Sequence, residues 1–347
     1  MTSNQNYFRQ LLWIVSHTLK LSPGLSFLIA ILRIVTSVFQ LLGVILLIGF
    51  IGEKQSFVDG GFPLADLFSG LTQQQPQVVV MLIISVFLIG IISRLFATRL
   101  TLKSEQRLIA DLDKIGYEKV LSLSQSGIPR SDTNGLTPSV LTGARCAGRI
   151  ARLNYGNITA ALQSIIGVVI LGSISPYLVF GFGCIGVIYL LITRPISKKT
   201  YSVSEAFIPQ SAMRRKSFRQ AVRQENGDPF IIEDNRFLDL NFARLYLVEL
   251  SRFSTSILFV CVLTIFLVGM TFNQIDFELT PTVLILIFFG IRFTLSGFQA
   301  FSTFLTTINR FLPRVRELEM TLKAENKADI SQIIQLRSGN DDDDDDE

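Results

Sequence analysis

The chain has 347 residues, of which 49% are hydrophobic and 17% are charged, and its formal net charge is +4. Its mean hydropathy of +0.44 is too apolar for an ordinary soluble domain and predicts a membrane protein. The single histidine, His17, and the three cysteines, Cys146, Cys184 and Cys261, stand far apart in the sequence. No Cys/His spacing typical of a metal site occurs, so the cysteines are interpreted as packing residues.

Residues 1–24 are predicted to form a helix that lies along the membrane surface. Their apolar residues recur at helical spacing before a Ser-Pro-Gly break, and they are Tyr7, Phe8, Leu11, Leu12, Val15 and Leu19. One apolar face of this kind is typical of an interfacial helix. The alternative is an extension of the first membrane span. No small-residue cleavage site follows a short apolar core, so the segment does not resemble a removed signal peptide.

Six apolar stretches are predicted to be transmembrane helices, because crossing the hydrocarbon core takes about 20 predominantly apolar residues in a helix. They run approximately over residues 25–51, 78–100, 158–173, 177–193, 254–272 and 282–305. Only residues 174–176 separate the third stretch from the fourth, so these two are expected to form a tight hairpin. The fold class predicted is an all-α membrane protein with six transmembrane helices.

The basic residues predict the orientation of these helices. Lys and Arg gather between the second and third spans and between the fourth and fifth, whereas the segments 52–77 and 273–280 are mainly acidic. Because basic residues stay on the cytoplasmic side, the two basic segments are expected to be cytoplasmic. Both chain termini are then cytoplasmic as well.

The cytoplasmic segments are predicted to be long helix extensions rather than separate domains. After the second span, Leu108, Leu112 and Ile115 recur at helical spacing among charged residues. About 20 further helical residues would project roughly 30 Å from the membrane. Turn-forming residues then cluster near 127–138 and 226–229. Each segment is therefore predicted to be an extended helical hairpin.

This order of spans and hairpins resembles the transmembrane domain of ABC exporters, over residues 11–318. Residues 309–313, Asn-Arg-Phe-Leu-Pro, are also similar to that family's exit from its last helix. In the family each cytoplasmic hairpin ends in a coupling helix that docks on an ATPase domain. The resemblance places these tips near residues 124–133 and 224–235. The candidate coupling residues are Gly127, Arg130, Asp132, Asp228, Pro229, Phe230 and Ile231.

The sequence departs from the family in that no ATP-binding motif is recognised, since G-x-x-x-x-G-K-[ST] does not occur. Residues 143–150 have the glycine spacing, but Arg149 and Ile150 replace Lys and Ser/Thr on a predicted helix. Residues 295–299, Leu-Ser-Gly-Phe-Gln, resemble the family's signature loop but lie in the sixth span. Ser296 and Gly297 are interpreted there as small residues that permit close helix packing.

Ionisable and polar residues inside the spans are the candidates for a substrate pathway. Arg33 is expected either to face the pathway or to extend to the cytoplasmic headgroups. Arg292 lies deeper in its span, so a role in a cavity is favoured. Gln40 and Gln299 are further pathway candidates, with interhelical hydrogen bonding as the alternative. The two arginines predict an anionic substrate or lipid headgroup.

The sequence therefore predicts the membrane subunit of a split ABC exporter. Residues 25–320 would form the transmembrane domain, and residues 321–347 a polar tail that is disordered at its acidic end. No catalytic site or cofactor is expected in this chain, and ATP and Mg²⁺ are expected on a separate ATP-binding subunit.

Further expected partners are a second transmembrane subunit and membrane lipid, with no nucleic acid. The expected location is a bacterial inner (plasma) membrane. The alternative is a membrane scaffold or regulatory protein with an exporter-like fold and no coupling to an ATPase. A passive channel or ion-coupled carrier is disfavoured, because the spans contain no acidic pair.

Overall fold

The computed structural model describes residues 3–51, 76–126, 128–224, 228–271 and 281–338. These residues are almost entirely α-helical and contain no strand. The helices are α1 (Ser3–Leu21), α2 (Pro23–Ile51), α5 (Pro76–Gln125), α6 (Arg130–Ile174), α7 (Pro176–Gln224), α8 (Asp228–Thr271), α9 (Pro281–Lys323) and α10 (Lys327–Ser338). The predicted all-α class is confirmed for this part of the chain.

Six of these helices are long and apolar enough to cross a membrane: α2, α5, α6, α7, α8 and α9. Each of the six predicted apolar stretches falls within one of them, apart from the last residue of the fifth stretch, residue 272. Several helices continue well beyond the apolar stretch. The 50 residues of α5 correspond to about 75 Å of helix, whereas the hydrocarbon core is about 30 Å thick.

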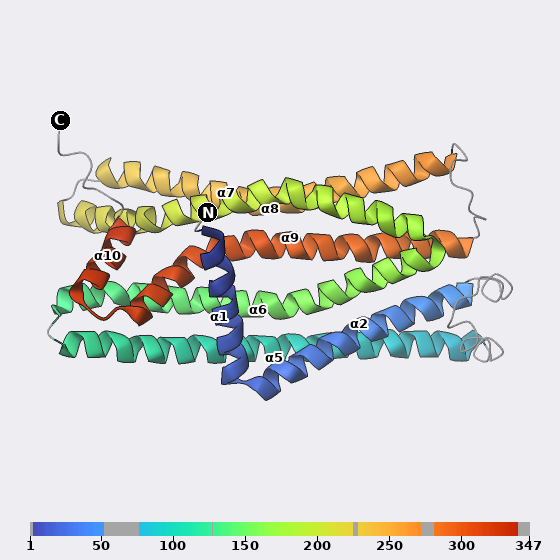
Figure 1. The fold of residues 1–347 in the computed structure, drawn as a ribbon, viewed down its shortest axis with the longest axis horizontal. Coiled ribbons are helices and arrows are strands. Elements are labelled where there is room, and N and C mark those ends of the chain that lie inside the picture. Colours follow the sequence, from blue (N-terminus) through green and yellow to red (C-terminus); the bar gives the residue numbers. More distant parts are fainter. Residues whose placement is uncertain (1–2, 52–75, 127, 225–227, 272–280, 339–347) are drawn as a thin grey trace.

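The long helices lie side by side along the long axis of the molecule (Figure 1). α5 and α6 approach each other at one end of the bundle, and α7 and α8 approach each other at the same end. The junction of α6 and α7 lies at the opposite end. The short helix α1 crosses the long helices at a steep angle near the middle of the bundle.

The junction between α6 and α7 is as tight as predicted. α6 ends at Ile174, Ser175 is extended (φ −160°, ψ 131°), and α7 begins with Pro176. Proline favours the first position of a helix and disfavours helical backbone in the residue before it. The local sequence therefore explains why one helix stops and the next begins here.

Small residues let α6 and α9 pack closely along their length. A Cβ atom at Gly167 of α6 would lie 2.6 Å from the backbone nitrogen of Thr294 in α9. A Cβ atom at Gly297 of α9 would likewise clash with Ser164 of α6. The interpretation of Gly297 as a residue that permits close helix packing is confirmed.

The largest apolar core lies where α1, α5, α6 and α9 meet. Ile14 of α1, Leu108 of α5, Ile150 of α6 and Leu312 of α9 are each at most 1% exposed. The buried side chain of Ile14 therefore packs α1 against the long helices. His17 of the same helix is hydrogen-bonded through Nε2 to Asp111 of α5 at 2.9 Å.

The tail that the sequence predicts to be polar includes the helix α10. Its N-terminus is capped reciprocally, because Asn326 Oδ1 accepts from the Asp329 amide at 2.9 Å and Asp329 Oδ2 accepts from the Asn326 amide at 3.3 Å. Ile330 and Ile333 are buried and form a cluster with residues of α5 and α6. These two isoleucines, with the partly buried Ile334, hold this segment against the bundle, although most of its other residues are polar. The acidic run 341–347 lies outside the described residues.

Candidate functional site

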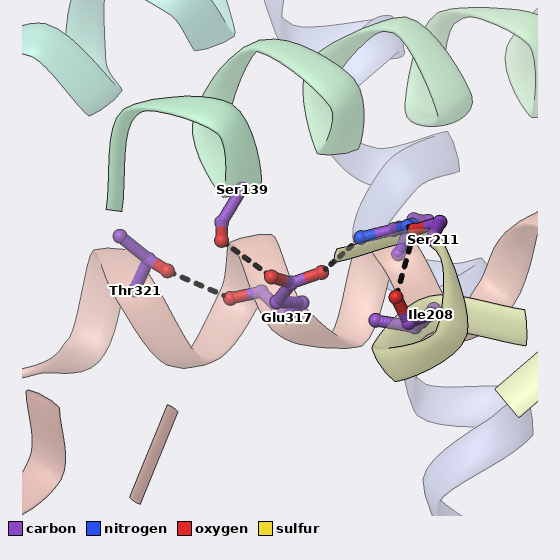
Figure 2. Close-up of polar contacts among 6 residues, drawn as sticks. Ser139, Ile208, Ser211, Glu317 and Thr321 are labelled. Atoms are coloured by element: carbon purple, nitrogen blue, oxygen red, sulfur yellow. Dashed lines mark hydrogen bonds and ion pairs between the residues drawn. The ribbon is translucent and has the colours of Figure 1, made fainter. Parts of the chain in front are cut away.

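A buried acidic residue, Glu317 of α9, joins three helices (Figure 2). It is 7% exposed, and its carboxylate accepts a hydrogen bond from Ser139 Oγ of α6. Its Oε2 atom also lies 3.0 Å from Nη1 of Arg314, nearly one turn earlier in α9. Arg314 Nη2 donates to Ser211 Oγ of α7 at 2.9 Å. Both carboxylate oxygens have partners, so this network is a clamp between α6, α7 and α9.

A cavity of about 40 Å³ lies beside this clamp. It is lined by Glu205, Ile208, Pro313, Arg316, Glu317, Met320 and Ile333. A cavity of this size holds a few water molecules and is too small for an organic substrate. The clamp and its cavity are therefore structural features.

A second polar feature, the arginine cluster, consists of Arg149 of α6, Arg244 of α8 and Arg310 of α9. Arg310 is close enough to Arg244 for their positive charges to repel, and the same holds for Arg149 and Arg310. The thiol of Cys146, a residue only 7% exposed, lies within reach of all three charges. Residues that are far apart in sequence, on α6, α8 and α9, thus bring like charges together.

Aromatic rings contact these arginines. The Cζ atoms of Arg149 and Arg310 lie 5.5 and 5.6 Å from the centroid of the Phe311 ring. Arg244 stacks over Phe207, with 3.9 Å between its Cζ atom and the ring centroid. Cation–π contacts of this kind favour a guanidinium but leave its positive charge in place.

The hydrogen-bonding capacity of the cluster is only partly used. Arg244 Nη2 donates to Asn241 Oδ1 at 3.0 Å. The Nε atoms of Arg244 and Arg310 are buried and have no hydrogen-bond partner in the part of the chain that the structure describes. Within that same part, none of the three arginines forms an ion pair with Asp or Glu. The cluster is therefore a region of uncompensated positive charge with free donors.

The predicted pathway arginines lie apart from this cluster. Arg33 of α2 is 9% exposed, and the positive charge of Arg94 of α5 lies near it. Arg292 of α9 is exposed. Among the described residues, no hydrogen bond or other contact joins Arg33 to Arg292. Their assignment to one pathway stays a prediction.

The two predicted pathway glutamines have different environments. Gln163 Nε2 of α6 donates a hydrogen bond to Gln40 Oε1 of α2 at 2.9 Å. This is the interhelical hydrogen bond that the sequence offers as the alternative role for Gln40. Gln299 is exposed and lies seven residues after Arg292, so the two share one face of α9.

The predicted coupling residues fall where paired helices end. Gly127 lies outside the described residues. Two of the others are helical and lie at the start of α6: Arg130 and Asp132. Four are helical and lie at the start of α8: Asp228, Pro229, Phe230 and Ile231. The side chains of these six residues also lie outside the description. Their role in coupling stays a prediction.

Sequence reasoning did not identify the arginine cluster as a site. In the sequence, Arg149 belongs to the glycine-spaced residues 143–150 and to the charge pattern that predicts orientation. Arg244 belongs only to that charge pattern, and Arg310 only to residues 309–313. Basic residues are expected throughout cytoplasmic segments, so no local signal distinguishes these three. Only the packing of α6, α8 and α9 shows that they meet.

No protein-family model matches the chain, and a comparison with curated protein sequences finds none that is similar to it. The class of protein is therefore inferred from the helices of this chain alone. Six helices of the described part have the length and composition of membrane spans. The chain is an integral membrane protein.

Proposed function

We propose that the chain is the membrane-spanning subunit of an ATP-driven exporter of the ABC type. In this proposal it forms the substrate pathway together with a second membrane subunit, and ATPase subunits on separate chains supply the driving force. The proposed location is the inner membrane of a bacterium, with the joined ends of α5–α6 and α7–α8 in the cytoplasm.

The observation that carries this proposal is the pairing of four long helices. α5 approaches α6, and α7 approaches α8, at one and the same end of the bundle (Figure 1). Each pair extends well beyond the length needed to cross the hydrocarbon core. Two stiff hairpins that end together favour a mechanism in which a soluble motor moves the membrane spans as rigid levers.

The test is an affinity purification of the full chain in mild detergent from its native host, followed by mass spectrometry. We expect a co-purifying protein that contains an ATP-binding phosphate loop, and we expect the complex to hydrolyse ATP. A chain that is recovered repeatedly without any ATPase, under conditions that preserve other membrane complexes, would contradict the proposal.

A variant tests the coupling tips more directly. Phe230→Glu with Ile231→Glu places two charges at the start of α8, where the proposal puts the contact with the ATPase. We expect ATP hydrolysis to continue without stimulation by substrate. Leu238→Glu, at a residue of the same helix that is 49% exposed, is the control and is expected to leave coupling intact.

One observation favours a second candidate function, that of a membrane scaffold or regulatory protein. α10 packs against the ends of α5 and α6, next to the first predicted tip. Ile330 and Ile333 of α10 are 1% and 2% exposed, and Leu123 and Leu136 are buried against them. A helix held permanently at this place would limit the access of an ATPase to that tip, and the purification distinguishes the two functions.

A further inference from the structure

We infer that Arg149, Arg244 and Arg310 form a binding site for a phosphate-bearing anion. The three residues come from α6, α8 and α9, so the site exists only in the folded bundle. Arg149 and Arg310 lie against the same ring, that of Phe311, and no carboxylate pairs with any of the three arginines in the described part of the chain. A bound anion supplies the missing negative charge.

The contrast with other arginines of the same helices supports a ligand site. Arginines of α6, α8 and α9 with a carboxylate partner within 4 Å are Arg152, Arg252, Arg314 and Arg316. The three arginines of the cluster have no such partner among the described residues, and Arg244 and Arg310 keep buried Nε donors unused.

The number of charges favours phosphate over a single carboxylate. A phosphate monoester carries a charge of about −1.5 to −2 near neutral pH and presents three strong acceptor oxygens. Guanidinium groups match such oxygens with two parallel hydrogen bonds each. One phosphate therefore has enough acceptor oxygens for guanidiniums that approach from three helices, and it offsets a large part of their combined charge.

The aromatic rings beside the cluster orient the guanidiniums for this task. The Cζ atoms of Arg149 and Arg310 both lie within 5.6 Å of the centroid of the Phe311 ring, and Phe207 supports Arg244 from its face. Stacking on a ring restricts a guanidinium plane and leaves its edge for hydrogen bonds. That the bound anion is also transported rests on the proposed exporter function.

Binding of the anion does not depend on an ATPase. The experiment measures binding to the purified full chain without any partner. Two probes are used: inorganic pyrophosphate titrated by calorimetry in neutral detergent, and phosphatidic acid in phosphatidylcholine nanodiscs, detected by native mass spectrometry. The test variant is Arg244→Gln with Arg310→Gln. The control is Arg252→Gln with Arg316→Gln, which removes the same number of charges from the same two helices. Circular dichroism and thermal unfolding check that each variant folds.

We expect the test variant to bind at least about tenfold more weakly than the control, as the loss of hydrogen bonds to charged groups implies. Binding of pyrophosphate identifies a soluble phosphate ligand, and binding of phosphatidic acid alone identifies a lipid headgroup. Equal affinity in the two double variants, or binding of neither probe by the unmodified chain, overturns the inference. If the test variant does not fold, Arg149→Gln at the exposed member takes its place, and undiminished binding there overturns the inference equally.

The binding experiment and the purification test the site and the exporter function separately. A chain that binds the anion through the arginine cluster but recovers no ATPase keeps the site and loses the proposed function. A chain that recovers an ATPase but binds neither probe keeps the function and loses the site.

Discussion

Gly167 lies where the backbones of α6 and α9 approach closely, and its replacement by alanine tests that contact. In Gly167→Ala the new Cβ atom would lie 2.6 Å from the backbone nitrogen of Thr294, so a helix must shift. We expect a loss of about 1–3 kcal/mol in the free energy of unfolding, as for other overpacked interiors. Thermal unfolding of the detergent-solubilised protein measures it.

The matched control is Gly156→Ala in the same helix, where nothing lies within 4 Å of the new Cβ atom. Replacement of a glycine inside a helix is expected to be neutral or to stabilise by about 0.5–1 kcal/mol. Equal effects of the two substitutions would show that α6 and α9 do not pack as described.

Glu317 tests the clamp between α6, α7 and α9. Glu317→Gln removes the negative charge beside Arg314, whose side chain is only 14% exposed, and leaves that charge unpaired. We expect a destabilisation of about 3 kcal/mol, because breaking a buried ion pair leaves an uncompensated charge. Chemical or thermal unfolding gives the value.

Glu205→Gln is the comparison for this prediction. Glu205 pairs with Arg316 at 3.5 Å, and the two side chains are 52% and 43% exposed. Removing an exposed pair of this kind is expected to cost no more than about 1 kcal/mol. The clamp assignment is wrong if Glu205→Gln destabilises the protein as much as Glu317→Gln does.

At the scale of elements, α10 is held against the bundle by a small apolar cluster. Ile330→Ala with Ile333→Ala removes its two most buried side chains, each worth about 2–5 kcal/mol in a packed core. We expect α10 to detach and amide hydrogen exchange to increase at the end of α5 and the start of α6. Exchange detected by mass spectrometry measures this change.

Ser331→Ala with Gln332→Ala alters exposed residues of the same helix and serves as the control. Exchange in α5 and α6 should stay at the level of the unmodified chain in this variant. Increased exchange in both variants, or in neither, would mean that Ile330 and Ile333 do not hold α10 against the bundle.

At the scale of the whole molecule, the two ends of the bundle are predicted to face opposite sides of the membrane. Tyr177, at the start of α7, is 85% exposed at one end, and Gln125 is exposed at the other. In a chain without native cysteines, Tyr177→Cys should react with a membrane-impermeant maleimide in intact cells. Gln125→Cys should react only in inverted vesicles, because basic residues stay in the cytoplasm. The reverse pattern would overturn the orientation.

The position of α1 agrees with this division of the molecule. α1 crosses the long helices near the middle of the bundle, and it is anchored by Ile14 and by the hydrogen bond between His17 and Asp111 (Figure 1). A helix at the membrane surface lies across helices that span the membrane. The part of the bundle with the arginine cluster and Glu317 then lies at or below the cytoplasmic surface in the proposed orientation.

The sequence by itself determined the helices and their order. A span must satisfy its own backbone hydrogen bonds and present about 20 apolar residues whatever its neighbours are, so apolar length alone predicts it. The break at Ser175 follows equally from Pro176. The role of Gly297 in close helix packing also followed from the sequence, because it depends on residue type and local spacing.

Only the tertiary structure decided which side chains meet. Arg149, Arg244 and Arg310 belong to three helices, and the rotation and register of each helix determine whether they face one another. The same holds for the docking of α10 and for the hydrogen bond between Gln40 and Gln163. Helical periodicity specifies which residues share a face but not which face opposes it, since many arrangements bury the same apolar area. The helices were therefore predictable from the sequence, whereas the arginine cluster was not.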